Sequence, residues 1–315
     1  MLKKQSIIDA DMPKPRVIVI CGPTGVGKTS SVIEIAKEFN GEIINADSMQ
    51  IYKYMDIGTA KPTLKEQACV KHHMIDIVNP DEPFDAAKFA KMARRIIMQL
   101  YKRNITPFIV GGTGFYIKAL LYGLFQAEPV DPDFRLRLKN EAEIDGAAFL
   151  HKRLKKYDPD TAEKIHPNDT YRIIRALEIL EATGKTISEY HREHRFADNP
   201  FEVLTIGLHM NREVLYDRIN RRVDTMISAG LLDEVKRLIG MGLAEELKPM
   251  QSIGYRHMID FIKGRISWDD TLQTFKRDTR RYAKRQFTWF KADPDILWTE
   301  PKELTEMCRL IKNFL

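Results

Sequence analysis

The sequence has few cysteines and no long apolar segment. Its three cysteines, Cys21, Cys69 and Cys308, are far apart in the chain, which argues against both a disulfide framework and a zinc site. No apolar run approaches the roughly 20 residues that a membrane-spanning helix requires. The opening residues, MLKKQSIIDADMPKPR, carry acids where a secretory signal would be apolar. We therefore expect a cytoplasmic protein that does not enter a membrane.

Internal repeats and low-complexity segments are also absent, which argues against a repeat array and a disordered chain. The chain has 315 residues, of which 43% are hydrophobic and 30% charged, so it can form one large core and a second, smaller unit. The net charge of +6 is modest and becomes informative only where basic residues are concentrated.

Short apolar segments with strand character alternate with longer segments of helical periodicity. This alternation predicts an α/β fold in which helices cover a parallel sheet, and the expected strands are 17–20, 42–45, 108–110, 203–208 and 296–298. Between Pro129 and Pro200 the pattern becomes charged and helical, without a convincing strand. We expect a core formed by 1–129 and 200–315, with an inserted all-helical subdomain at 130–199.

A glycine-rich segment follows the first expected strand and precedes a helical run at 32–39. This segment, CGPTGVGKTS, fits the P-loop pattern G-x-x-x-x-G-K-[ST]. Its glycines let the backbone curl so that N–H groups point at an anion, and the following helix adds its positive end. The residues expected to hold phosphates, with Thr29 as a Mg²⁺ ligand, are Gly22, Pro23, Thr24, Gly25, Val26, Gly27, Lys28 and Thr29. With this loop, the sheet is expected to be of the P-loop nucleotide-kinase type.

The sequence lacks two features of other P-loop proteins. The third strand, in FIVGGTGFY, ends in Gly111, Gly112 and Thr113, where many P-loop ATPases place an aspartate that holds Mg²⁺. The guanine-binding pattern N-K-x-D is also missing. GTPases and motor-type ATPases are therefore disfavoured, which leaves small kinases and other transferases that act on phosphate esters.

Two further segments could carry chemistry, and each has a plainer interpretation. Asp47 follows the second strand, where it could act as a base or hold Mg²⁺ through water, or could only cap a turn. Arg218 and Arg222 lie one helical turn apart and could clamp a diphosphate, or could form a surface charge ladder with neighbouring acids, Asp217 and Asp224. The residue types alone leave both choices open.

Basic residues are concentrated in KRDTRRYAKRQFTWFK, residues 276–291. On a helix, Arg277, Arg281 and Arg285 form one stripe with Arg280 and Lys284 beside it, and Asp278 is the only acid in the segment. Such a face attracts a polyanion, although a solvated helix face is the alternative.

Ordered motifs along nearly the whole chain resemble those of bacterial tRNA dimethylallyltransferases, also called tRNA isopentenyltransferases. One departure is Gly25, where this family more often has alanine, a change that should leave the loop functional. The motifs that carry the resemblance are GPTGVGKT (22–29), NADSMQIY (45–52), MDIGTAKP (55–62), HHMIDI (72–77), GGTGFY (111–116), HPND (166–169), SIGYR (252–256) and AKRQFTWF (283–290).

The resemblance implies transfer of a dimethylallyl group from dimethylallyl diphosphate to N6 of adenosine 37, next to the anticodon of a tRNA, with Mg²⁺ as cofactor. By similarity, Asp47 is the base, and Lys28 and Arg222 stabilise the departing diphosphate. A monomer is expected. The residues implied to contact tRNA are Asp47, Ser48, Met49, Gln50, Thr113, Arg135, Gln251, Ser252, Ile253, Gly254, Tyr255, Arg256, Thr279, Arg280, Arg281, Tyr282, Ala283, Lys284, Arg285 and Gln286.

Two other functions remain possible at this point. An ATP-dependent small-molecule or nucleoside kinase would share the P-loop and the acid after the second strand, but it leaves the basic segment 276–291 unexplained. A nucleotide-switched RNA-binding protein without chemistry would leave Asp47 and Arg222 unexplained.

Overall fold

The computed structural model describes residues 13–124, 131–194 and 199–315. The chain divides into two compact units, one formed by Met1–Leu121 with Pro200–Leu315 and the other by Tyr122–Asn199. The chain is divided after Leu121 and after Asn199, and the expected bounds of the inserted subdomain were 130–199. The predicted boundary at 129–130 lies outside the described residues. Within the described ranges, no helix is long and apolar enough to cross a membrane.

The first unit contains a six-stranded parallel sheet with the strand order β3-β2-β4-β1-β5-β6. The five predicted strands are confirmed. The sequence analysis missed β3, which is only two residues long and therefore leaves no periodic pattern to detect. The strands are β1 (Arg16–Cys21), β2 (Gly41–Asn45), β3 (His72–His73), β4 (Thr106–Gly111), β5 (Glu202–Leu208) and β6 (Leu297–Thr299).

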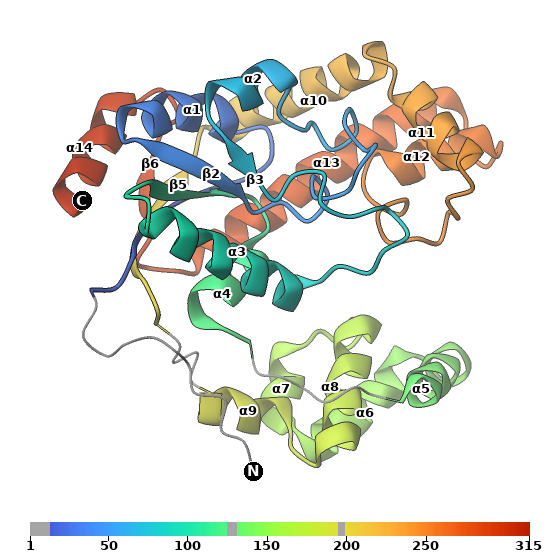
Figure 1. The fold of residues 1–315 in the computed structure, drawn as a ribbon. Helices are drawn as coiled ribbons and strands as arrows, with labels where there is room; N and C mark the ends of the chain where they lie inside the picture. The colour runs from blue at the N-terminus through green and yellow to red at the C-terminus, as the bar shows by residue number, and fades with distance from the viewer. Residues whose placement is uncertain (1–12, 125–130, 195–198) are drawn as a thin grey trace. The chain divides into compact units, whose positions relative to one another are not determined.

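Helices cover both faces of the sheet, with α1 and α14 on one side and α3 and α4 on the other (Figure 1). Residues of α1, α10 and α14 pack with Ile18, Ile20 and Ile206 of the strands in one buried core. The helices of this unit are α1 (Lys28–Glu38), α2 (Leu64–Cys69), α3 (Ala86–Tyr101), α4 (Gly114–Tyr122), α10 (Arg212–Ser228), α11 (Leu231–Gly240), α12 (Tyr255–Ile262), α13 (Trp268–Lys291) and α14 (Leu304–Phe314).

The described residues of the second unit form helices and no strand, around a small core of their own. Leu138, Leu150, Leu154 and Ile173 are at its centre, each almost fully buried. The helices are α5 (Pro132–Asp145), α6 (Ala147–Tyr157), α7 (Pro159–Lys164), α8 (Thr170–Thr183) and α9 (Ile187–His194).

The parallel order of the strands brings three strand ends together. Cys21 at the end of β1 is in register with Gly111 at the end of β4, and Asn45 at the end of β2 is in register with Val110. Ligands of open α/β sheets bind at such carboxyl ends, and the P-loop follows β1 directly. The candidate site is therefore expected at this edge of the sheet.

Candidate active site

The P-loop backbone adopts conformations that suit glycine. Gly22 and Gly27 have φ angles of 148° and 108°. A Cβ atom on Gly22 would lie 2.7 Å from the carbonyl oxygen of Leu208, so no other residue fits there. Gly27 is also the N-cap of α1, and the first N–H groups of a helix are free to bind an anion.

Lys28 is held inside the loop. Its Nζ donates hydrogen bonds to the carbonyl oxygens of Gly22 at 2.8 Å and Pro23 at 2.9 Å. Burial lowers the pKa of Lys28 to about 8, which the negative charge of Asp47 partly opposes and the positive charge of Arg222 reinforces. The ammonium of Lys28 is therefore easier to deprotonate than that of an ordinary lysine, and a bound anion would restore its pKa.

We expect the affinity for inorganic diphosphate to fall by up to about tenfold per pH unit above pH 8. The free protein loses the Lys28 proton as the pH passes its pKa of about 8, whereas the bound anion keeps the lysine charged. Below that pH the ammonium is already present, so this group no longer affects binding. Isothermal titration calorimetry across the range from about pH 7 to about pH 10 measures the effect.

Lys28→Arg is the matched control for this titration, because arginine stays protonated throughout the range. Its profile reports only the protonation of diphosphate itself. If the wild-type and Lys28→Arg profiles have the same slope above pH 8, Lys28 does not control binding.

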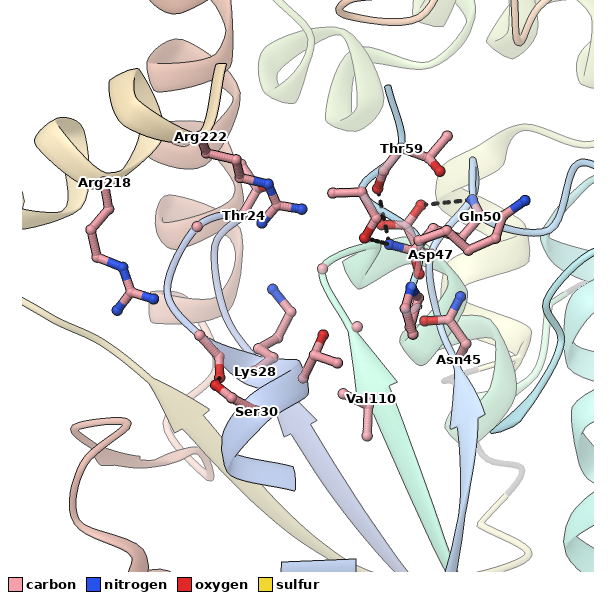
Figure 2. Close-up of a pocket in the computed structure, with 18 of the residues that line it drawn as sticks. Thr24, Lys28, Ser30, Asn45, Asp47, Gln50, Thr59, Val110, Arg218 and Arg222 are labelled. Atoms are coloured by element: carbon pink, nitrogen blue, oxygen red, sulfur yellow. Dashed lines mark hydrogen bonds between the residues drawn. The ribbon is translucent and has the colours of Figure 1, made fainter. Parts of the chain in front are cut away.

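Asp47 follows β2 and faces the P-loop across the strand ends (Figure 2). Its Oδ1 accepts hydrogen bonds from the backbone N–H groups of Met49 at 2.8 Å and Gln50 at 3.3 Å. The turn interpretation is thus correct for one oxygen. In the described structure the other oxygen, Oδ2, has no hydrogen-bond partner, so the same turn fixes a carboxylate that can still accept a proton.

Arg218 and Arg222 of α10 both face the P-loop (Figure 2). The Nη1 of Arg218 donates to the carbonyl oxygen of Val26 at 3.4 Å, and burial lowers the pKa of Arg222 while Asp47 opposes that shift. The surface ladder exists, but its arginine is Arg221, which pairs with Asp217. The predicted pair therefore lines the same cavity as the P-loop.

Two adjoining cavities of about 590 Å³ and about 340 Å³ meet at Asp47. The first is lined by the P-loop, Arg218 and other polar groups, and it suits an anion. The second has several apolar side chains, namely Met49, Ile219, Val223, Met226, Ile253 and Phe275. The residues that line both cavities are Thr24, Asp47, Thr59, Arg222 and Tyr282.

Comparison with known proteins fits these observations. A family model described as IPP transferase matches residues 50–293. The tRNA dimethylallyltransferase of Desulfosudis oleivorans is 55% identical over 96% of this chain and 96% of that protein. tRNA dimethylallyltransferase 2 of Syntrophus aciditrophicus is 53% identical over 96% of this chain and 97% of that protein. The chain belongs to the tRNA dimethylallyltransferase family.

Solved structures of this family share the fold. The full-length tRNA isopentenylpyrophosphate transferase of Bacillus halodurans is 41% identical with a TM-score of 0.72, covering 96% of this chain and 97% of that one. A eukaryotic dimethylallyltransferase described as acting on tRNA is 31% identical with a TM-score of 0.78, covering 95% of this chain and 77% of that one. These relatives do not favour the kinase alternative or the binding protein without chemistry.

The end of β4 leaves no room for the aspartate that many P-loop ATPases have at this position. A Cβ atom on Gly111 would lie 2.1 Å from the Ala46 carbonyl oxygen, and one on Gly112 would lie 2.2 Å from Nε2 of Gln286. Gln286 instead joins two loops: its Nε2 donates to the Gly112 carbonyl oxygen and its Oε1 accepts from Thr24 N–H, both at 2.8 Å.

Twelve of the twenty residues implied to contact tRNA fall into three groups. Arg281, Lys284 and Arg285 are exposed on α13, as the stripe predicted. Arg135 lies in the second unit, where it forms an ion pair with buried Glu178. Those that line the second cavity are Asp47, Ser48, Met49, Gln251, Ser252, Ile253, Thr279, Tyr282 and Arg285.

Four of the implied residues are instead enclosed by the protein. The side chains of Tyr255 and Ala283 are 0% exposed, and Gly254 and Gln286 are buried. Tyr255 packs against Gly58, where a Cβ atom would lie 2.4 Å from its ring. These four residues are buried in the structure, and their contact with tRNA stays a prediction.

Glu234 of α11 is a supporting residue that the sequence analysis missed. Its carboxylate is 2% exposed and accepts hydrogen bonds from the N–H groups of Asp56, Ile57 and Gly58 at 2.9 to 3.1 Å. The hydroxyl of Tyr255 donates a fourth at 2.6 Å. The segment that it holds leads directly to Thr59, which lines both cavities. In the sequence, the indication was that this acid lies on the apolar face of the helix, where a charged side chain needs hydrogen-bond partners.

Glu234→Gln is expected to lower the free energy of unfolding by roughly 2–4 kcal/mol. The amide keeps the shape of the side chain, but it replaces a charged acceptor and turns an NH₂ group toward backbone donors. Urea unfolding measures the change. Glu246→Gln, at an exposed position, is the control, and equal stability of the two variants would contradict a structural role for Glu234.

Proposed function

We propose that this chain transfers the dimethylallyl group of dimethylallyl diphosphate to N6 of adenosine 37 in tRNA and releases diphosphate. The observation that carries the proposal is the position of Asp47 and Arg222, which line both the anion cavity and the adjoining apolar cavity. The family's relatives are named for this transfer to tRNA.

The arrangement supports a direct displacement. The diphosphate binds at the P-loop, and N6 of the adenine attacks C1 of the dimethylallyl group as the C1–O bond breaks. Lys28, Arg218 and Arg222 stabilise the negative charge that develops on the leaving diphosphate. Asp47, at the junction of the cavities, accepts the proton that N6 loses. The target base must leave its stack, which costs less in a loop than in a duplex.

The residues present fit a Mg²⁺ ion that arrives with the diphosphate. The described residues contain no group of three or more His, Cys, Asp or Glu side chains that could hold a metal alone. Mg²⁺ needs no such group, because it keeps several waters and binds substrate phosphates with one or two protein oxygens. The Thr29 hydroxyl would hold it directly, and the ion would neutralise charge on the leaving diphosphate.

We also propose that the enzyme acts as a monomer in the cytoplasm.

The exposed basic face of α13 is proposed to bind tRNA phosphates. Charge reversal by Arg281→Glu and Arg285→Glu should weaken tRNA binding and reduce its log–log salt slope by about 0.7 to 0.9 for each phosphate that the protein no longer neutralises. Both side chains are exposed, so the change should not disturb the core. Fluorescence anisotropy with labelled tRNA at several salt concentrations measures the slope.

Arg309→Glu and Lys312→Glu on α14 form the matched control, because they make the same change of net charge on another exposed helix. If the two double variants have equal log–log salt slopes for tRNA binding, the basic residues of α13 form only a solvated helix face.

The reaction itself is tested by incubating the protein with Mg²⁺, dimethylallyl diphosphate and unmodified tRNA. The tRNA is then digested, and the masses of its nucleosides are measured by mass spectrometry. We expect one adenosine per tRNA to gain the mass of a dimethylallyl group in place of hydrogen. A tRNA with guanosine at position 37 is the control. Modification of that tRNA, or none of either, would contradict the proposal.

A further inference from the structure

Asn45 has a buried amide nitrogen without a hydrogen-bond partner in the described part of the chain. It is the last residue of β2, it is 7% exposed, and its Nδ2 makes no hydrogen bond. Buried donors are almost always paired in folded proteins, because an unpaired one loses its hydration without compensation. An unpaired donor at a strand end next to a cavity therefore points to a ligand.

The cavity that Asn45 lines is the one that holds the P-loop. Figure 2 shows Asn45 at the end of its strand below Asp47, among the residues around Lys28. Asn45 does not line the adjoining apolar cavity. Asn45 therefore borders the place of the anion and not the place of the base or the prenyl chain.

The neighbouring strand end contributes no side chain that could take this role. Strand β4 ends at Gly111, where the Ala46 carbonyl oxygen fills the space of a Cβ atom. Asn45 thus supplies a polar side chain on β2, beside the strand end where other P-loop proteins have an acid. It is neutral, so it adds no negative charge beside an anion. A half-turn of the amide exchanges its nitrogen and oxygen, which have nearly the same shape, so the donor can turn to the ligand.

We propose that Asn45 binds substrate by donating a hydrogen bond from Nδ2 to an oxygen of the diphosphate. The inference rests on the proposed function, in which the diphosphate of the prenyl donor occupies the P-loop cavity. Asn45 would then reinforce the grip of Lys28 and Arg222 on the leaving group from the β2 side of the cavity.

The test measures binding of inorganic diphosphate with Mg²⁺ by isothermal titration calorimetry. Asn45→Ala should weaken binding about tenfold to a hundredfold, which is the usual value of a hydrogen bond to a charged group. Asn45→Leu keeps the volume without the polar atoms and should match alanine. Asn313→Ala, at an exposed position on α14, should bind as the wild type does.

A thermal melt without ligand separates binding from a structural role. Removing an unpaired buried donor should leave the melting temperature of the Asn45→Leu variant unchanged or raise it. A lower melting temperature with unchanged affinity would overturn the proposal. Equal affinity of all variants would overturn it while leaving the proposed function intact. A wild-type protein that binds no diphosphate would overturn both.

Discussion

Replacement of Asp47 by asparagine is expected to lower kcat by roughly 10² to 10⁴ while tRNA affinity stays nearly unchanged. Asparagine keeps the shape of the side chain, and its oxygen can still accept from the N–H groups of Met49 and Gln50. It cannot accept the proton from N6 of the adenine. Single-turnover kinetics with saturating dimethylallyl diphosphate measure the loss, and anisotropy measures tRNA binding.

Asp233→Asn is the control for this variant, because Asp233 is an exposed acid on α11 whose side chain lies away from both cavities. It should retain full activity. Turnover near the wild-type value in Asp47→Asn would remove Asp47 from the role of base and leave it only the turn.

Lys28→Ala is expected to lower kcat/KM by about 10² to 10³. The C1–O bond breaks as charge builds on the diphosphate, so the ammonium of Lys28 stabilises the transition state more than the bound substrate. The loss should therefore appear mainly in kcat. In the wild type, inorganic diphosphate should compete with dimethylallyl diphosphate for the same loop. Steady-state kinetics with and without added diphosphate measure both effects.

Lys37→Ala tests the specificity of this effect, because Lys37 lies on the same helix, α1, but at an exposed position in its last turn. We expect its kinetics to match those of the wild type. A requirement for ATP, or the lack of competition by diphosphate, would show that the ligand of the P-loop is misassigned. In that case the kinase function would again be the better interpretation.

The sequence by itself determined the features that depend on local chemistry. The P-loop could be recognised because its glycines, lysine and threonine act within one continuous turn, and Gly22 and Gly27 have the φ angles that this turn requires. Five of the six strands could be recognised from short apolar segments. The stripe of Arg277, Arg281 and Arg285 on α13 could be recognised because helical spacing alone puts these residues on one face.

The resemblance of the motifs to a family predicted roles for Asp47 and Arg222 that the residue types alone left open. On chemistry alone, Asp47 could have been only a turn residue, and Arg222 could have belonged to a surface ladder. The structure shows both at the cavities. In Asp47 one carboxylate oxygen forms the turn, and among the described residues the other has no hydrogen-bond partner. Their catalytic roles stay predictions that the two variants above test.

Only the tertiary structure decided which residues from distant segments meet. Lys28 from α1, Asp47 after β2 and Arg222 from α10 surround one cavity because β1 pairs with both β4 and β5, and no local pattern encodes that strand order. The contacts of Gln286 and Glu234 were also decided only by the tertiary structure. Each looks like an ordinary polar residue of a helix, and its role arises from backbone groups of another segment that must have a hydrogen-bond partner when the fold buries them.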